Sequence, residues 1–81
     1  MTIKYFSTPT CAPCKTFAPI VDRVMNEVQI PYQKINASTS EMAAYYGVTS
    51  VPTIIIERGG QIIKRYTGVM TYSQLLSFVT N

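Results

Sequence analysis

The apolar positions change their spacing several times along the chain, and each change marks a different element. Residues 2–7 carry β-branched and aromatic side chains before a proline, which predicts a short strand. Helical spacing predicts a helix over residues 11–29, with Thr10 as its N-cap and Pro13 in its first turn. Pro19 lies inside this pattern and is expected to kink the helix. The side chains that define the apolar face are Phe17, Ile20, Val21, Val24, Met25 and Val28.

The middle of the chain carries three further elements. Residues 32–36 follow a proline and form a second strand candidate. Residues 41–46 form a short helix that Gly47 closes at its C-terminal end. The unbroken apolar run over residues 53–57 predicts a strand that is buried on both faces.

The last third of the chain reads as a hairpin followed by a helix. Gly59 and Gly60 form a turn signal, and residues 61–66 return as the hairpin partner. Thr71 and Gln74 have the spacing of a capping box. The final helix would present an apolar face made of Leu75, Leu76, Phe78 and Val79.

The expected order of elements is β-α-β-α-β-β-α, which is an α/β arrangement. Strands that alternate with helices favour parallel pairing through right-handed crossovers, and the glycine hairpin adds an antiparallel strand at an edge. We therefore expect a four-stranded mixed sheet with helices on both faces. A chain of 81 residues supports a single domain, spanning residues 1–81.

Composition and charge narrow the class of protein. The chain is 47% hydrophobic and 14% charged, which is typical of a globular domain. Its net charge of +3 is dispersed and contains no basic run, so nucleic-acid binding is not expected. No apolar run approaches the length of about 18 residues that a membrane span needs, and the start of the chain lacks a secretory signal. We expect a cytoplasmic monomer that binds no membrane.

The chain has two cysteines, Cys11 and Cys14, in a Cys-x-x-Cys spacing. A disulfide across so short a loop restricts the unfolded chain little, so a purely structural staple explains the pair poorly. Zinc needs about four ligands, and this chain has no histidine, so only a dimer that pools two pairs could complete such a site. An inert buried pair is the other alternative. A Cys-x-x-Cys beside a βαβ pattern favours redox chemistry over both.

A helix start suits this chemistry because the thiolate is the nucleophile. The unpaired N–H groups at the helix N-terminus and the nearby Lys15 favour the anion of Cys11, so we expect its pKa to be lowered by about one unit or more. Cys14 lies one helical turn later and should be the more buried sulfur. Cys11 would attack a substrate disulfide, and Cys14 would resolve the mixed disulfide.

The sequence resembles the thioredoxin/glutaredoxin-like family in two segments. Residues 11–20 (CAPCKTFAPI) resemble the thioredoxin active-site helix, and residues 46–53 (YGVTSVPT) resemble the segment that carries a cis-proline opposite the cysteines. The resemblance runs from about residue 2 to the end and lacks the first strand and helix of longer thioredoxins. In size the chain is closer to glutaredoxins and to minimal thioredoxins of microbes and phages. The resemblance implies a thioredoxin-like fold.

The resemblance also implies roles for individual residues. Cys11 would be the nucleophile, Cys14 the resolving thiol and Pro52 the cis-proline. A cis Val51–Pro52 bond would turn the Val51 backbone outward, so that a substrate strand could pair with it beside Cys11. The implied substrate-binding residues are Thr10, Ala12, Pro13, Val51 and Pro52, with Lys15 tuning the thiol pKa and no metal ligand among them.

Three positions depart from the thioredoxin pattern. Thr10 stands where thioredoxins usually have a tryptophan, which removes part of the recognition surface. Tyr5 stands at the position of the buried aspartate that accepts the proton of the resolving cysteine, and the partner lysine is replaced near Gln33. Water, Tyr5 or the substrate thiolate would then accept this proton, and Tyr5 can equally be a core aromatic residue.

These observations predict a thiol–disulfide oxidoreductase that reduces protein disulfides through Cys11 and Cys14 and needs no bound cofactor. Its electron donor would be a flavin-dependent, thioredoxin-reductase-like enzyme or glutathione.

Two alternatives stay open. One is a glutathione-dependent glutaredoxin or cluster carrier: the glycine motif of that family is absent after Gly68, but Lys4, Lys15 and the Val51 backbone could hold a glutathione carboxylate. The other is a redox-independent binding subunit, because the many tyrosines cannot all be buried in so small a core.

Overall fold

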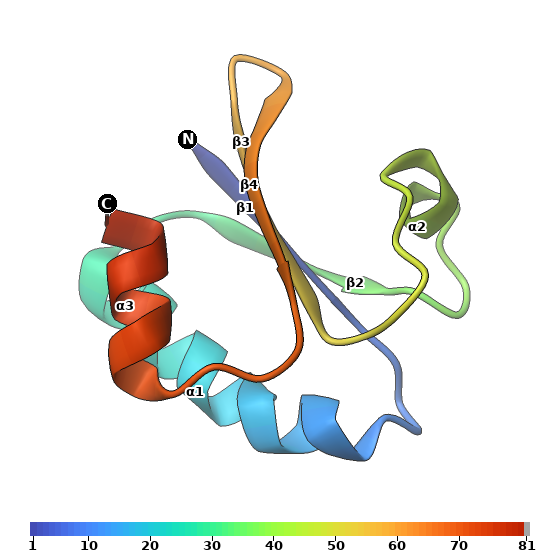
Figure 1. The fold of residues 1–81 in the computed structure, drawn as a ribbon, viewed down its shortest axis with the longest axis horizontal. Coiled ribbons are helices and arrows are strands. Elements are labelled where there is room, and N and C mark those ends of the chain that lie inside the picture. The colour runs from blue at the N-terminus through green and yellow to red at the C-terminus, as the bar shows by residue number, and fades with distance from the viewer. Residues whose placement is uncertain (81) are drawn as a thin grey trace.

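A four-stranded sheet organises the chain in the computed structural model, which describes residues 1–80 (Figure 1). The elements follow the predicted order, and most of their bounds agree with the prediction to within a residue or two. In chain order they are β1 (Thr2–Ser7), α1 (Ala12–Val28), β2 (Tyr32–Asn36), α2 (Met42–Tyr45), β3 (Thr53–Arg58), β4 (Gln61–Thr67) and α3 (Tyr72–Thr80).

The strands lie in the order β2-β1-β3-β4. β1 and β2 pair in parallel, whereas β3 pairs antiparallel with both β1 and β4. The mixed sheet and the hairpin at its edge are confirmed. The parallel pairing that helix alternation favoured holds for β2 and is wrong for β3. Because α2 has four residues and spans about 6 Å, it does not carry the chain back along the sheet. β3 therefore starts from the end at which β2 finishes.

Helices cover both faces of the sheet, as predicted (Figure 1). α1 and α3 pack on one face, where Ile3 and Tyr5 of β1 meet Ile54 and Ile56 of β3. α2 lies on the opposite face, where a smaller apolar cluster forms from Phe6, Ile35, Ala43 and Ile55. Alternate residues of β3 thus face opposite clusters, which confirms that this strand is buried on both faces.

The start of α1 differs from the prediction in one residue. The N-cap is Cys11, not Thr10: its backbone is extended, and its Sγ accepts the N–H of Cys14 at 3.1 Å. The reason is a turn before the helix, in which the Cys11 N–H donates to the Thr8 carbonyl at 3.3 Å and Thr10 lies inside the turn. α1 then continues through Pro19 to Val28.

The hairpin between β3 and β4 depends on its two glycines. Gly59 has a φ of +60° and Gly60 a φ of +81°. Two consecutive positive φ angles are typical of the type I′ turn, whose twist matches that of the flanking strands and which glycine adopts without a steric cost. The glycine pair is therefore what brings the exposed edge strand β4 beside β3.

A charged cluster, formed by Lys4, Glu57 and Tyr46, lies at the sheet face that α2 covers. The Lys4 ammonium is 2.6 Å from one Glu57 oxygen, and the Tyr46 hydroxyl donates to the other at 2.7 Å. Hydrogen bonding from Lys4 and then Tyr46 lowers the pKa of Glu57, and the hydrogen bond to Glu57 raises the pKa of Lys4. The Arg65 guanidinium of β4 donates to the carbonyls of Tyr46 and Gly47 at 2.9 and 3.3 Å. The cluster and Arg65 together tie the end of α2 to the sheet.

Replacing Glu57 with Gln tests this cluster. We expect the free energy of unfolding to fall by roughly 1–3 kcal/mol at pH 7, because a charged hydrogen-bond acceptor is lost and the Lys4 ammonium loses its partner. The folded pKa of Glu57 lies below its ordinary value of 4.5, so its contribution is complete above about pH 4.5 and is lost as the pH falls through the folded pKa. Chemical denaturation between pH 7 and 3 should therefore show that the free energy of unfolding falls less as the pH is lowered in Glu57→Gln than in the wild type.

Glu41→Gln is the matched control for this measurement. Glu41 is exposed at the start of α2, and the same change there should alter stability by no more than about 0.5 kcal/mol. If the free energy of unfolding fell equally with decreasing pH in the wild type and in Glu57→Gln, the assigned role of the cluster would be contradicted.

The tyrosines divide as the composition suggested. Tyr5 is buried with 1% of its surface exposed, whereas Tyr45 is 83% exposed and Tyr66 is 41% exposed. Tyr32, Tyr46 and Tyr72 are partly buried at the rims of the two apolar clusters. Across residues 1–80, no helix has the length and apolar character needed to cross a membrane.

Candidate active site

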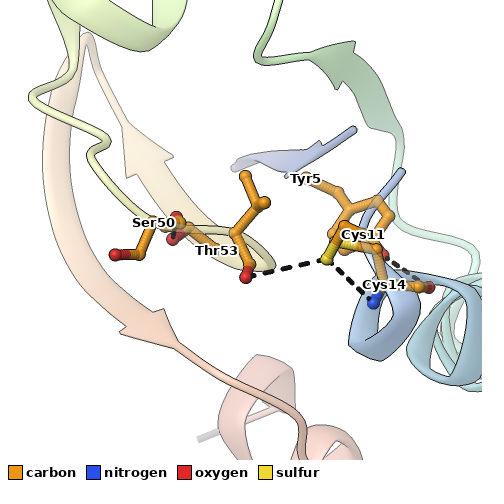
Figure 2. The surroundings of a disulfide bond; sticks show 6 residues. Tyr5, Cys11, Cys14, Ser50 and Thr53 are labelled. Atoms are coloured by element: carbon orange, nitrogen blue, oxygen red, sulfur yellow. Dashed lines mark hydrogen bonds between the residues drawn. A yellow bond between two sulfur atoms is a disulfide. The ribbon is translucent and has the colours of Figure 1, made fainter. Parts of the chain in front are cut away.

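Cys11 and Cys14 form a disulfide at the N-terminus of α1, with their Cα atoms 5.2 Å apart (Figure 2). Pro13 lies in the first turn of the helix between them, where its missing N–H has no intrahelical partner to lose. The structure thus brings together the two residues that the sequence singled out as the redox pair.

The two sulfurs differ in burial. Cys14 is only 3% exposed, whereas Cys11 is partly exposed at the tip of the helix. This confirms the expectation that the second cysteine is the more buried one. A bulky disulfide substrate therefore reaches Cys11 far more easily than Cys14.

The surroundings of Cys11 favour negative charge on its sulfur. Its Sγ lies 3.1 Å from the backbone nitrogen of Cys14, whose N–H points at it, and the first turn of α1 carries no acidic residue. Lys15 is exposed one residue beyond Cys14. A helix N-terminus and a nearby ammonium group both stabilise a thiolate.

The loop before β3 faces Cys11 from the other side (Figure 2). The Val51 carbonyl oxygen lies 3.8 Å from the Cys11 Sγ. The Val51–Pro52 peptide bond is cis, as the resemblance implied, and the Pro52 side chain is buried. Residues 40 positions apart in the sequence therefore form one site.

Thr53, Thr67 and Gly68, to which the sequence analysis gave no role at the site, hold this loop in place. The buried Thr53 hydroxyl donates to the Ser50 carbonyl at 2.7 Å and lies 3.0 Å from the Thr67 hydroxyl of β4. The Gly68 N–H donates to the Pro52 carbonyl at 2.8 Å. A threonine that opens an otherwise apolar strand is the signal that could have identified Thr53.

The other predicted substrate-binding residues surround the pair. Thr10, Ala12 and Pro13 are exposed at the start of α1, and Val51 is partly buried in the facing loop. Lys4, considered above as a ligand for a glutathione carboxylate, is already bonded to Glu57. No group of three or more His, Cys, Asp or Glu side chains gathers within residues 1–80 in a way that could hold a metal ion.

Tyr5 lies beneath the pair as a core aromatic residue with a polar end. Its ring packs edge-on against Phe17, with centroids 5.9 Å apart, and its hydroxyl donates to the Cys14 carbonyl at 3.3 Å. Burial raises the pKa of Tyr5, so its hydroxyl stays protonated at neutral pH. Gln33 is exposed on β2.

A Cys-x-x-Cys pair at a helix N-terminus, faced by a cis-proline loop on this mixed sheet, defines the class of thioredoxin-fold proteins that exchange thiols and disulfides. The sequence model described as Thioredoxin matches residues 1–81, and the chain belongs to the thioredoxin family. The chain is therefore a thiol–disulfide oxidoreductase, as the sequence predicted.

Individual relatives agree with this assignment. The thioredoxin of Haemophilus influenzae is 31% identical over 77 residues, covering 91% of this chain and 72% of that protein. The bifunctional thioredoxin reductase/thioredoxin of Mycobacterium leprae is 38% identical over 69 residues, covering 82% of this chain and 15% of that protein. The structure of Fasciola hepatica thioredoxin has a TM-score of 0.89 and 27% identity, covering 98% of this chain and 77% of that chain.

Replacing Thr53 with Val tests the loop contacts, because the change keeps the side-chain shape and removes the hydroxyl. We expect a loss of about 1–2 kcal/mol in the free energy of unfolding, since the Ser50 carbonyl loses its donor. The KM for a protein disulfide should rise, because the loop that carries Val51 is held less firmly. Denaturation and steady-state reduction assays measure the two effects.

Thr49→Val is the control for this substitution, since Thr49 is exposed in the same loop. It should leave both stability and KM close to the wild-type values. A Thr53→Val variant that matches Thr49→Val in both measurements would show that the Thr53 hydroxyl does not hold the loop.

Proposed function

We propose that the protein reduces disulfides in other proteins, with Cys11 as the nucleophile and Cys14 as the resolving thiol. The observation that carries this assignment is the asymmetry of the pair: Cys11 is accessible at the helix tip, and Cys14 is 3% exposed. The Cys11 thiolate attacks one sulfur of the substrate disulfide and forms a mixed disulfide, releasing the other substrate sulfur as a thiolate. Cys14 then attacks Cys11, and the second substrate thiolate leaves.

The pKa of the Cys11 thiol in the reduced protein is proposed to lie below its ordinary value. The support is geometric, because the Cys14 N–H points at the Cys11 sulfur and the first turn of α1 lacks a carboxylate. Lys15 adds a positive charge on the same turn. Because Lys15 is exposed, solvent and salt screen its contribution.

The substrate is proposed to bind as an extended segment along the Val51 backbone, with Thr10, Ala12, Pro13 and the buried Pro52 shaping the surface around it. Support comes from the position of Val51, whose carbonyl lies 3.8 Å from the Cys11 sulfur. An extended peptide that pairs with this backbone would bring its disulfide to the exposed side of Cys11. We further propose that residues 1–81 act as one domain, as a monomer, in the cytoplasm.

Substituting the two cysteines one at a time tests the assigned roles. Cys11→Ser should abolish reduction of a protein disulfide, because no nucleophile remains at the surface. Cys14→Ser should accumulate a mixed disulfide with the substrate, because the intramolecular attack is lost. Turnover assays and non-reducing gels with mass spectrometry measure these outcomes.

The two variants control for each other, since both remove one thiol and the disulfide. Full turnover by Cys11→Ser, or trapping by Cys11→Ser instead of Cys14→Ser, would contradict the assignment. Binding of partner proteins that is equal in the wild type and the double variant, without any turnover in the wild type, would favour the redox-independent binding subunit.

A flavin-dependent, thioredoxin-reductase-like enzyme is the proposed electron donor, and glutathione is the alternative. The support is the Mycobacterium leprae relative, which is described as a bifunctional thioredoxin reductase/thioredoxin. The ion pair between Lys4 and Glu57 also removes one of the cations that could have held a glutathione carboxylate.

Competition between the two donors tests this proposal. The oxidised protein should be reduced by NADPH with a thioredoxin reductase faster than by glutathione with glutathione reductase. The consumption of NADPH measures both reactions, and the double Cys→Ser variant supplies the background rate. Faster reduction by the glutathione system would overturn the proposed donor and leave the thiol–disulfide chemistry in place.

A further inference from the structure

Exposed apolar side chains gather along β4, the strand at one edge of the sheet. β4 is the last strand in the sheet order, so only one of its two edges pairs with a strand within residues 1–80. Six large apolar side chains are exposed in this part of the chain, and four of them lie on β4 or directly after it. These four are Ile62, Ile63, Tyr66 and Val69. Apolar surface beside an unpaired strand edge is typical of a site that receives another chain.

A groove of about 550 Å³ lies between β4 and α3. Tyr66 of β4 and Phe78 of α3 line it with aromatic rings whose centroids are 6.2 Å apart, and the buried Met70 lines it as well. Ser73 and Ser77, one helical turn apart on α3, add hydroxyl groups to its lining. An apolar groove with a few polar groups suits a bulky apolar side chain.

The excess positive charge of the chain lies in the same region. Residues 1–57 contain four Lys/Arg and four Asp/Glu, whereas residues 58–81 contain three Lys/Arg and no Asp/Glu. The three cations all lie in the β3–β4 hairpin and are Arg58, Lys64 and Arg65. The exposed Arg65 guanidinium donates to carbonyl groups at the end of α2, which are neutral and leave its charge intact. The complementary partner is therefore acidic.

Hydrogen bonding along β4 determines which of its amides face the free edge. The Gly68 N–H donates to the Pro52 carbonyl, toward β3, and backbone groups two residues apart in a strand point the same way. The amide of Tyr66 therefore points at β3, and the amides of Arg65 and Thr67 point away from the sheet. An added antiparallel strand would exchange hydrogen bonds with Arg65 and Thr67.

The same register determines the side chains that an added strand needs. Tyr66 pairs with Ile54, whose side chain belongs to the cluster beneath α1 and α3, so Tyr66 faces the groove. Side chains directly opposite each other lie on the same face of a sheet. A residue opposite Tyr66 would enter the groove and should be apolar. A residue opposite Arg65 would lie on the other face, where a carboxylate can meet the guanidinium.

We propose that the free edge of β4 and the groove beside α3 form a docking site for an extended segment of a partner protein in which apolar and acidic residues alternate. The segment adds to β4 as an antiparallel strand and places an apolar side chain in the groove. This β4 docking site goes beyond the proposed function, because it requires neither cysteine. A second copy of the chain does not fit, since symmetric pairing through the middle of β4 would set Lys64 and Arg65 against the same cations of the other strand.

Binding of synthetic peptides tests the β4 docking site. The probe is a fluorescent peptide of seven residues, the length of β4, in which Leu and Glu alternate. It should bind the wild type and the double Cys→Ser variant equally, and more weakly as the salt concentration rises. A peptide with Lys in place of Glu should bind at least about tenfold more weakly. No saturable binding of the probe, or equally tight binding of a single-stranded oligonucleotide of the same charge, would overturn the proposal.

Methylation of the peptide nitrogens tests the backbone pairing separately from the side chains. In the antiparallel strand, the Glu residues opposite Arg65 and Thr67 bond to β4, and the Leu residues point their N–H groups outward. Methylating the Glu nitrogens should therefore abolish binding, and methylating the Leu nitrogens should leave the Kd within about twofold of its original value. Binding of the unmethylated peptide should also slow hydrogen exchange at the Arg65 and Thr67 amides. Any other pattern of loss would overturn the antiparallel docking.

Variants of the groove test its part in binding. Tyr66→Ser removes one aromatic wall and should weaken binding of the probe about tenfold. Ser73→Leu places a side chain in the groove and should weaken binding to a similar extent. Tyr45→Ser is the matched control, because Tyr45 is 83% exposed on α2, and it should leave the Kd unchanged. Chemical denaturation checks that each variant is folded, and a Kd equal to that of the wild type in both groove variants would overturn the role of the groove.

Turnover of a protein disulfide, measured on the same samples, separates this proposal from the proposed function. Normal turnover without binding of the probe would overturn the β4 docking site and leave the roles of the cysteines intact. Binding of the probe without any turnover would overturn the proposed function and leave the β4 docking site in place.

Discussion

The antiparallel pairing of β1 with β3 is the constraint on which the site depends. It places the start of β3 beside the end of β1, with Phe6 paired to Thr53. The chain leaves β1 toward Cys11 and enters β3 from Val51. The two loops therefore meet at the same end of these central strands. The Cys11 sulfur consequently lies between the Cys14 N–H and the Val51 carbonyl, at 3.1 and 3.8 Å. A β3 parallel to β1 would begin at the opposite end of the strands, and Val51 would then lie far from Cys11.

Two acidic residues, Glu57 and Asp22, are bonded to specific partners on the two faces of the sheet. On the α2 face, Glu57 is bonded to Lys4 and Tyr46, which also ties the end of α2 to the sheet. On the other face, Asp22 is bonded to Lys34 and Tyr32. Near the Cys11 sulfur, the Cys14 N–H points at it and Lys15 is exposed on the same helix turn. A backbone N–H at a helix start and an ammonium group both stabilise a thiolate.

Local sequence patterns were sufficient to predict where the strands and helices lie. They were insufficient to predict the residue that caps α1 and the direction of β3. Hydrophobic spacing, together with proline, glycine and capping signals, located the strands and helices, because each element must bury an apolar face and must end at a turn. The preference for threonine at helix caps pointed to Thr10, but the turn from Thr8 to Cys11 decides which residue caps α1. Helix alternation suggested a parallel β3, but the short α2 leaves the chain at the same end of the sheet.

By itself, the sequence determined the redox pair and its asymmetry, since the spacing of Cys11 and Cys14 at a helix start places one sulfur at the tip and the other a turn inside. Only the tertiary structure decided what surrounds them. The contact between Thr53 and Thr67 and the ion pair between Lys4 and Glu57 join residues far apart in the chain. Such contacts follow from strand order and direction, which short-range spacing does not encode.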